Sequence, residues 1–169
     1  EDGYRAVVIE MDTPGGLSSS MREIVKGILA ADIPVVVYVA PPGASADSAG
    51  AVIGMSADVL AMAPQTNIGS STPVSIGGED ISRDLRRKIV NDAAAYIGEL
   101  AREHGRNVKV SREMVTKATN LGAREALTAA PLASSPACRR GSAWQGRSLP
   151  RRSSPGSART PRRPCASLP

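Results

Sequence analysis

The chain has 169 residues, enough for one domain with a real core, and 41% of them are hydrophobic, which is ordinary for a globular protein. The net charge of +5 does not indicate a nucleic-acid-binding domain, because eight of the 21 Lys and Arg residues lie in residues 132–169, which contain no Asp or Glu. Residues 1–131 carry 13 basic and 16 acidic residues, a net charge of −3, so no nucleic-acid partner is expected.

The first half of the chain alternates between strand and helix signals. Residues 4–11 are rich in β-branched side chains and predict a strand, which the turn sequence DTPGG of residues 12–16 ends. A helix over residues 20–29 follows from apolar side chains at helical spacing, with Ser20 and Glu23 as a capping box. Residues 34–39 form a short apolar run, typical of a strand that is covered on both faces.

The second half continues the alternation. It predicts a buried helix over 48–55, a strand over 59–63, a loop over 64–82, a long helix over 85–100 that ends near 104–105, and further helices over 111–119 and from 124 onward. Repeated strand-helix units predict the α/β class with a mainly parallel sheet. No run approaches the roughly 18 apolar residues of a membrane span, so none is expected in this chain.

The sequence changes character near residue 130. Residues 131–169 are rich in Pro, Ser, Arg and Ala, lack periodicity and have few large apolar side chains, so we expect a disordered tail. The globular domain is therefore assigned to residues 1–130. The tail has the composition of an out-of-frame translation of a GC-rich gene, and it holds both cysteines, Cys138 and Cys165, leaving the domain without a thiol. The start at Glu1, directly before a strand, suggests that upstream sequence is missing.

Two segments could carry the chemistry of acyl transfer, which needs a nucleophile and donors to an oxyanion. The turn with Gly15 and Gly16 ends a strand, where backbone N–H groups can approach a ligand, although a plain strand-to-helix turn is the simpler interpretation. Ser48 begins the small-residue helix, where helix N–H groups would stabilise negative charge. A structural N-cap serine explains that position equally well.

Acyl transfer also needs a general base that takes the proton of the nucleophile. His104, the only histidine, lies among charged residues at a predicted helix end, which makes a Ser-His-Asp triad improbable. A lysine can replace histidine where burial lowers its pKa. Lys88 flanks the apolar stripe of the long helix and is the best-placed lysine, although the pattern alone favours a solvated side chain.

Four segments in register resemble the NfeD family of membrane-bound ClpP-class serine proteases, also called stomatin operon partner proteins. They are MDTPGGL of 11–17, SADSAG of 45–50, APQTNIG of 63–69 and KIVND of 88–92. The resemblance spans residues 4 to about 128. It implies a ClpP/crotonase-like fold and endopeptidase activity on hydrophobic segments.

Carried over residue by residue, the resemblance makes Ser48 the nucleophile and Lys88 the general base. Gly15, Gly16 and the Ala49 N–H become the oxyanion site, and neither a metal nor an organic cofactor is needed. It also implies a membrane-anchored parent protein with the protease domain outside the cytoplasm, a stomatin-like partner and a homo-oligomer.

The chain departs from the family pattern at Asp47, where a small neutral residue is expected. A carboxylate there is expected to repel the oxyanion or to pair with Lys88, either of which would slow catalysis. Family members also have an additional strand and helix before this segment and a strand after it.

Two alternatives to a protease remain open. One is an inactive ClpP-fold assembly module, and the other is an acyl-CoA-binding crotonase relative, which Ser48 and Lys88 argue against.

Overall fold

The structure is a computed structural model that describes residues 3–74 and 82–129. The predicted tail over 131–169 therefore lies outside the described residues. The elements are β1 (Val7–Met11), α1 (Ser18–Leu29), β2 (Val35–Val39), β3 (Ser45–Asp47), α2 (Ala49–Ser56), β4 (Val59–Met62), β5 (Asn67–Gly69), α3 (Arg83–Glu103), α4 (Val108–Thr116), β6 (Asn120–Gly122) and α5 (Ala123–Ala129).

Two small sheets organise the chain. The first has the order β1-β2-β4 with every pair parallel, so the predicted α/β class with a mainly parallel sheet is confirmed. The second has the order β3-β5-β6, in which β3 and β5 are parallel and β5 and β6 antiparallel. A bridge between Thr13 and Ala46 joins the end of β1 to β3 and so connects the sheets.

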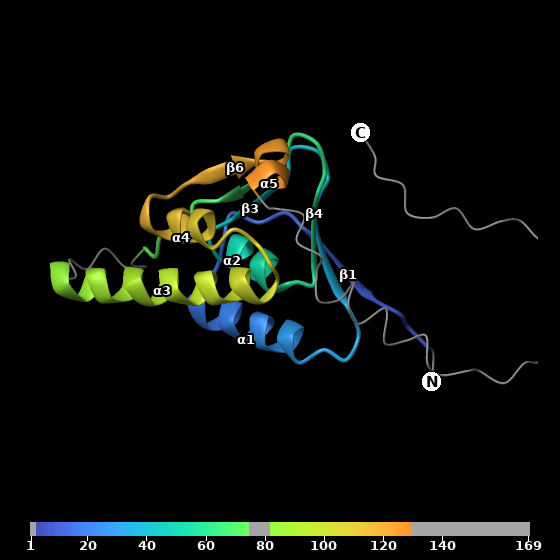
Figure 1. Cartoon of the computed structure of the whole chain (residues 1–169), viewed down its shortest axis with the longest axis horizontal. Coiled ribbons are helices and arrows are strands. Elements are labelled where there is room, and N and C mark those ends of the chain that lie inside the picture. The colour runs from blue at the N-terminus through green and yellow to red at the C-terminus, as the bar shows by residue number, and fades with distance from the viewer. Residues whose placement is uncertain (1–2, 75–81, 130–169) are drawn as a thin grey trace, which may run out of the picture.

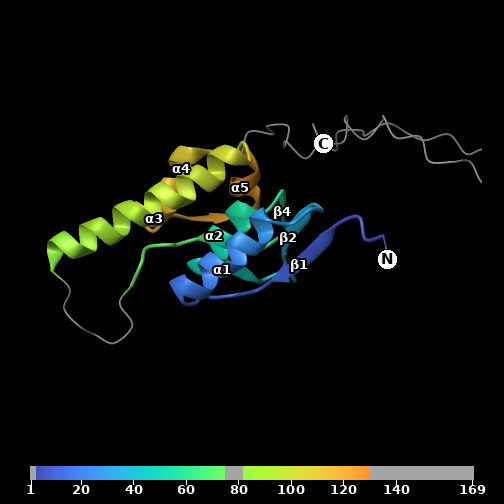
Figure 2. The ribbon, with the colours of Figure 1, turned by 90° about the horizontal axis from the view of Figure 1, so that it is seen from below.

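Helix α2 lies at the centre of the molecule, in contact with α1, α3, β3 and β5 (Figures 1 and 2). Its residues from Gly50 to Ser56 are all buried, as expected of a helix that is apolar on every side. Gly50 packs on the end of β1, where a β-carbon on this residue would lie 2.6 Å from Thr13 Cγ2. Small side chains therefore let α2 approach the turn that follows β1.

The structure departs from the sequence predictions in several places. Strands β3, β5 and β6 have three residues each, too short for alternation to reveal them, and β5 lies inside the predicted loop. The capping box at Ser20 and Glu23 is wrong, because α1 begins at Ser18 behind Leu17 and has no side-chain cap. Helix α4 begins three residues earlier than predicted, because the side chain of Asn107 accepts a hydrogen bond from the Val110 N–H and caps it.

Candidate active site

Ser48 occupies the junction between β3 and α2. Its backbone has φ 53° and ψ −113°, a conformation that costs a non-glycine residue about 1–3 kcal/mol and persists only where the surroundings impose it. Ser48 is the N-cap residue of α2, yet its hydroxyl accepts no capping hydrogen bond. The capping explanation of this serine therefore does not hold, and the hydroxyl is left for other chemistry.

The glycine turn after β1 lies directly against Ser48. Gly15 has φ +131°, and a β-carbon at this position would lie 2.8 Å from Ser48 Cβ and 3.2 Å from Ser48 Oγ. The Thr13 hydroxyl accepts a hydrogen bond from the Gly15 N–H at 3.1 Å and so fixes the turn. Only glycine allows this backbone to approach the serine so closely.

A cavity of about 190 Å³ opens beside Ser48. Three predicted site residues, Gly16, Ser48 and Ala49, line it together. Its other walls come from α1, α2, α3 and the segment after β5: Ser18, Met21, Arg22, Val52, Ser71, Pro73, Ile89, Asp92, Ala93 and Tyr96. The cavity thus combines a serine hydroxyl, a glycine-rich turn and a helix N-terminus with largely apolar walls.

The structure does not bring the Lys88 side chain to Ser48. Its side chain is exposed on α3 and is absent from the cavity lining, whereas the next residue, Ile89, lines it. Within the described ranges, the Lys88 side chain makes no hydrogen bond or ion pair. His104 lies eight residues beyond the last lining residue of α3, about 12 Å along the helix, and its Nδ1 contacts the Leu100 carbonyl at 2.9 Å.

A sequence model of the family described as "NfeD1b, N-terminal domain" matches residues 1–134. This chain belongs to that family. The NfeD1b N-terminal domain is thus the unit whose fold and site are described above. The recognition made from the four sequence segments is confirmed.

Curated and solved relatives agree with this membership. The chain is 45% identical over 130 residues to the membrane-bound protease PH1510 of Pyrococcus horikoshii; this match covers 75% of the chain and 29% of the relative. The chain thus spans less than a third of that protein.

The solved structures cover the N-terminal part of that protease, described as a membrane-bound stomatin-specific protease. One, a serine-to-alanine mutant, aligns with TM-score 0.70 and 43% identity over 76% of this chain and 63% of its own. Another, a lysine-to-alanine mutant in complex with a substrate peptide, aligns with TM-score 0.69 and 41% identity over 76% of this chain and 59% of its own. The NfeD1b domain described here therefore has the fold of that protease domain.

The structure shows what the Asp47 side chain contacts. The Asp47 carboxylate does not pair with Lys88, so that expectation is wrong. Instead its Oδ1 accepts hydrogen bonds from the side-chain amides of Asn67 at 3.0 Å and Asn120 at 3.1 Å. The amides come from β5 and β6, and they hold the carboxylate on the second sheet.

An ion pair that sequence reasoning missed spans the cavity from α1 to α3. Arg22 Nη2 lies 2.7 Å from Asp92 Oδ2, and its guanidinium carbon lies 4.4 Å from the centre of the Tyr96 ring. All three residues line the cavity. They lie on predicted helices, but helical spacing alone carries no information on which residues of two different helices meet. Ser71, a further lining residue, fell in the predicted loop.

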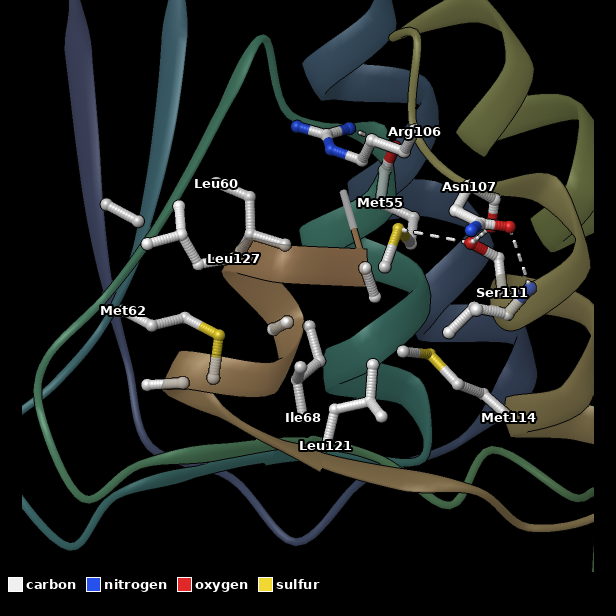
Figure 3. A pocket seen from close by; sticks show the side chains of 15 residues that line it. Met55, Leu60, Met62, Ile68, Arg106, Asn107, Ser111, Met114, Leu121 and Leu127 are labelled. Carbon is white, nitrogen blue, oxygen red and sulfur yellow. Dashed lines mark hydrogen bonds between the residues drawn. The ribbon is translucent and has the colours of Figure 1, made fainter. Parts of the chain in front are cut away.

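A larger cavity of about 240 Å³ lies under α5, at the other end of α2, and Figure 3 shows its walls. Met55, Met62 and Met114 contribute to an apolar lining, with Arg106 at one end. The Arg106 guanidinium donates to the Met55 carbonyl at 2.8 Å and the Ala57 carbonyl at 2.7 Å. Burial lowers the pKa of Arg106 to about 10, while the Asp58 charge opposes this shift. Arg106 thus secures the C-terminal end of α2.

Residues 3–74 and 82–129 contain no group of three or more His, Cys, Asp or Glu side chains that could hold a metal ion. None of the helices in these ranges is long and apolar enough to cross a membrane.

Proposed function

We propose that this chain is the catalytic part of a serine endopeptidase that works through a Ser-Lys dyad. The observation that carries the proposal is the approach of Gly15 to Ser48 at the N-terminus of α2, beside a cavity that Gly16, Ser48 and Ala49 line. Backbone N–H groups of the turn and of the first helical residue are the donors that an oxyanion requires. The name of the curated relative, a membrane-bound protease, supports the same activity.

The proposed reaction is acyl transfer in two steps. The uncharged Lys88 amine takes the proton of Ser48 Oγ as the oxygen attacks the scissile carbonyl carbon. The Gly16 and Ala49 amides stabilise the oxyanion, while the Gly15 N–H stays bonded to the Thr13 hydroxyl and holds the turn in place. Lys88 then gives its proton to the leaving amine as the peptide bond breaks. Water next attacks the acyl-enzyme with the help of Lys88 and releases the new carboxylate and free Ser48.

The Lys88 side chain must change its conformation for the proposed dyad to form. Lys88 directly precedes the cavity-lining Ile89 on α3, but its own side chain is exposed and does not line the cavity. The proposal requires the ε-amine to turn from solvent toward Ser48 Oγ and to reach hydrogen-bond distance in the substrate complex. Bound substrate would also remove water from this end of the cavity.

The apolar walls favour a hydrophobic polypeptide segment as substrate. Met21, Val52, Ile89 and Ala93 surround the cavity next to Ser48. Because a solved relative is described as stomatin-specific, we propose a stomatin-like membrane protein as the source of that segment. By the same resemblance, the proposed parent protein is membrane-anchored and homo-oligomeric, with this domain outside the cytoplasm.

A second candidate is a non-catalytic assembly module with the same fold, and the exposure of Lys88 is the observation that favours it. A hydrophobic fluorogenic peptide and the full 169-residue chain separate the two. We expect cleavage by the unaltered chain and a loss of roughly a thousandfold or more in Ser48→Ala and in Lys88→Ala. Lys26→Ala, which removes an exposed lysine paired with Glu23 on α1, is the matched control and should cleave normally.

The outcomes separate the parts of the proposal. An unaltered chain that does not cleave the peptide supports the assembly module. Full activity in Ser48→Ala contradicts a serine nucleophile. Loss in Ser48→Ala with full activity in Lys88→Ala keeps the nucleophile but removes Lys88 as the base.

A further inference from the structure

One face of the second sheet carries a connected group of polar side chains that includes Asp47, the residue before Ser48. In the ladder, Ala46, Ile68 and Leu121 are paired across the three strands, and Ala46 and Ile68 are fully buried. Because side chains alternate along a strand, their neighbours lie on the opposite face. Asp47, Asn67 and Asn120 are those neighbours.

These three side chains form a closed ring of hydrogen bonds. Asp47 Oδ1 accepts from Asn67 Nδ2 at 3.0 Å and from Asn120 Nδ2 at 3.1 Å, and Asn67 Nδ2 also donates to Asn120 Oδ1 at 3.2 Å. Asn120 Nδ2 further contacts Ser70 Oγ at 3.4 Å. Hydrogen bonds to a carboxylate are stronger than those between neutral groups, so the two bonds that Asp47 accepts contribute most to holding the ring together.

Ser48 follows Asp47 directly, and the same structural unit holds its backbone. The Ser48 N–H donates to the Gly69 carbonyl of β5 at 2.9 Å. The Ser48 carbonyl accepts from the Ser71 hydroxyl at 3.1 Å. The unfavourable φ of 53° at Ser48 needs such restraints on both sides, because without them the residue would relax to an ordinary conformation.

We propose that Asp47, through Asn67 and Asn120, is a positioning residue that fixes the backbone of Ser48 and thereby aims Oγ at the oxyanion site beside Gly15. The carboxylate acts through the backbone and does not touch the substrate. This role rests on the proposed function for its catalytic consequence, while its effect on the Ser48 backbone is independent of that function. In this role the Asp47 carboxylate speeds the reaction of Ser48, whereas repulsion of the oxyanion would slow it. Removal of the carboxylate should therefore slow the nucleophile.

The test measures covalent labelling of Ser48 in the full-length chain by a fluorophosphonate probe. Ser48 Oγ attacks phosphorus, the O–P bond forms as fluoride leaves, and the serine proton passes to the base. Asp47→Ala should lower the second-order labelling rate constant by roughly tenfold or more, as expected from a misaimed nucleophile. Asp47→Asn keeps an oxygen acceptor for both amides and should label within about threefold of the unaltered chain.

Further measurements separate positioning from general loss of structure. With the peptide substrate, Asp47→Ala should lower kcat with little change in KM. Asn120→Ala, which removes one donor from an exposed residue, should lower the labelling rate in the same direction, and the double variant should lose no more than Asp47→Ala alone. Asp32→Ala, the loss of an exposed aspartate after α1, should label normally.

Hydrogen exchange at the Ser48 amide gives a result independent of chemistry. It should speed up in Asp47→Ala and not in Asp47→Asn. Unchanged or faster labelling in a folded Asp47→Ala, or unchanged Ser48 exchange, overturns the positioning role. If Asp47→Ala does not fold, unchanged labelling and exchange in Asn120→Ala overturn it. An unaltered chain that is not labelled but whose Ser48 exchange still depends on Asp47 refutes the proposed function alone.

Discussion

Gly15 and Ser48 approach so closely that position 15 has no room for a side chain. A β-carbon there would lie 2.8 Å from the Ser48 β-carbon, closer than such atoms come in real proteins, and the backbone at Gly15 has φ +131°. The glycine thus serves two needs at once, a conformation that other residues rarely adopt and the contact that places turn amides at the serine.

Gly15→Ala should therefore lower peptide cleavage and fluorophosphonate labelling by about a hundredfold, because the turn must move away from Ser48. Urea unfolding should show a loss of stability of about 1–3 kcal/mol from the strained φ. Gly27→Ala is the matched control, since a β-carbon at this exposed position of α1 meets nothing within 4 Å. It should retain activity and gain up to about 1 kcal/mol. Normal labelling by Gly15→Ala would contradict the proposed oxyanion turn.

The ion pair between Arg22 and Asp92 should contribute little energy but should depend on salt. The two side chains are 42% and 71% exposed, so a double-mutant cycle should give a coupling of about 0.2–1 kcal/mol, which high salt reduces. Arg22→Ala should cost somewhat more than Asp92→Ala, because it also removes the contact with the Tyr96 ring. The pair of Arg87 and Asp84, within α3, is the control for an ion pair that joins no second helix. Equal costs for Arg22→Ala and Asp92→Ala would argue against the ring contact.

Acyl-CoA thioesters should not stabilise the chain. Crotonase relatives usually place carboxylates at the reacting centre, whereas Asp92 is the single carboxylate among the described residues that line the Ser48 cavity, and it pairs with Arg22. A thermal-shift measurement with saturating thioester should leave Tm unchanged, while coenzyme A alone controls for nonspecific effects. A Tm rise of several degrees with the thioester only would favour the crotonase alternative.

The sequence predicts the longer elements of this fold and misses the short ones. Helices α1, α2 and α3 and the strands of the first sheet follow from periodicity and from apolar runs. Strands β3, β5 and β6 have three residues each and depend on contacts between segments far apart in the chain. Tertiary contact, rather than local preference, creates them, so no local pattern announces the second sheet.

The candidate site divides in the same way. Sequence patterns and the family resemblance together point to Gly15, Gly16, Ser48 and Ala49, and the structure brings these residues together. The partners of Asp47 could not be predicted, because Asn67 and Asn120 meet it only through the second sheet. Alternation of polar with apolar residues in segments 45–47, 67–69 and 120–122 is the one signal present, and it is weak over three residues. The position of Lys88 beside an apolar stripe does not predict whether its amine meets Ser48, and in the structure this side chain is exposed.

Arg106 should be the most important cation for stability, because it satisfies carbonyls at the end of the central helix. Its guanidinium donates to Met55 and Ala57, so Arg106→Met should leave these acceptors unsatisfied and destabilise the chain by about 1–3 kcal/mol in urea unfolding. Arg102→Met, which removes an exposed arginine that pairs with Glu99 on α3, is the matched control and should cost less than about 1 kcal/mol.

The pH dependence of the stability that Arg106 contributes follows from its lowered pKa. Burial brings the pKa of Arg106 to about 10 in the folded state, below that of a free arginine side chain, so the unfolded chain holds this proton more tightly. Stability from this group therefore rises with pH only above about 10, and it is constant below. The cost of Arg106→Met should be the same from roughly pH 6 to 8, because Arg106 stays charged throughout. A cost that changes across this range would show that the charge of Arg106 is coupled to a group that titrates near neutrality.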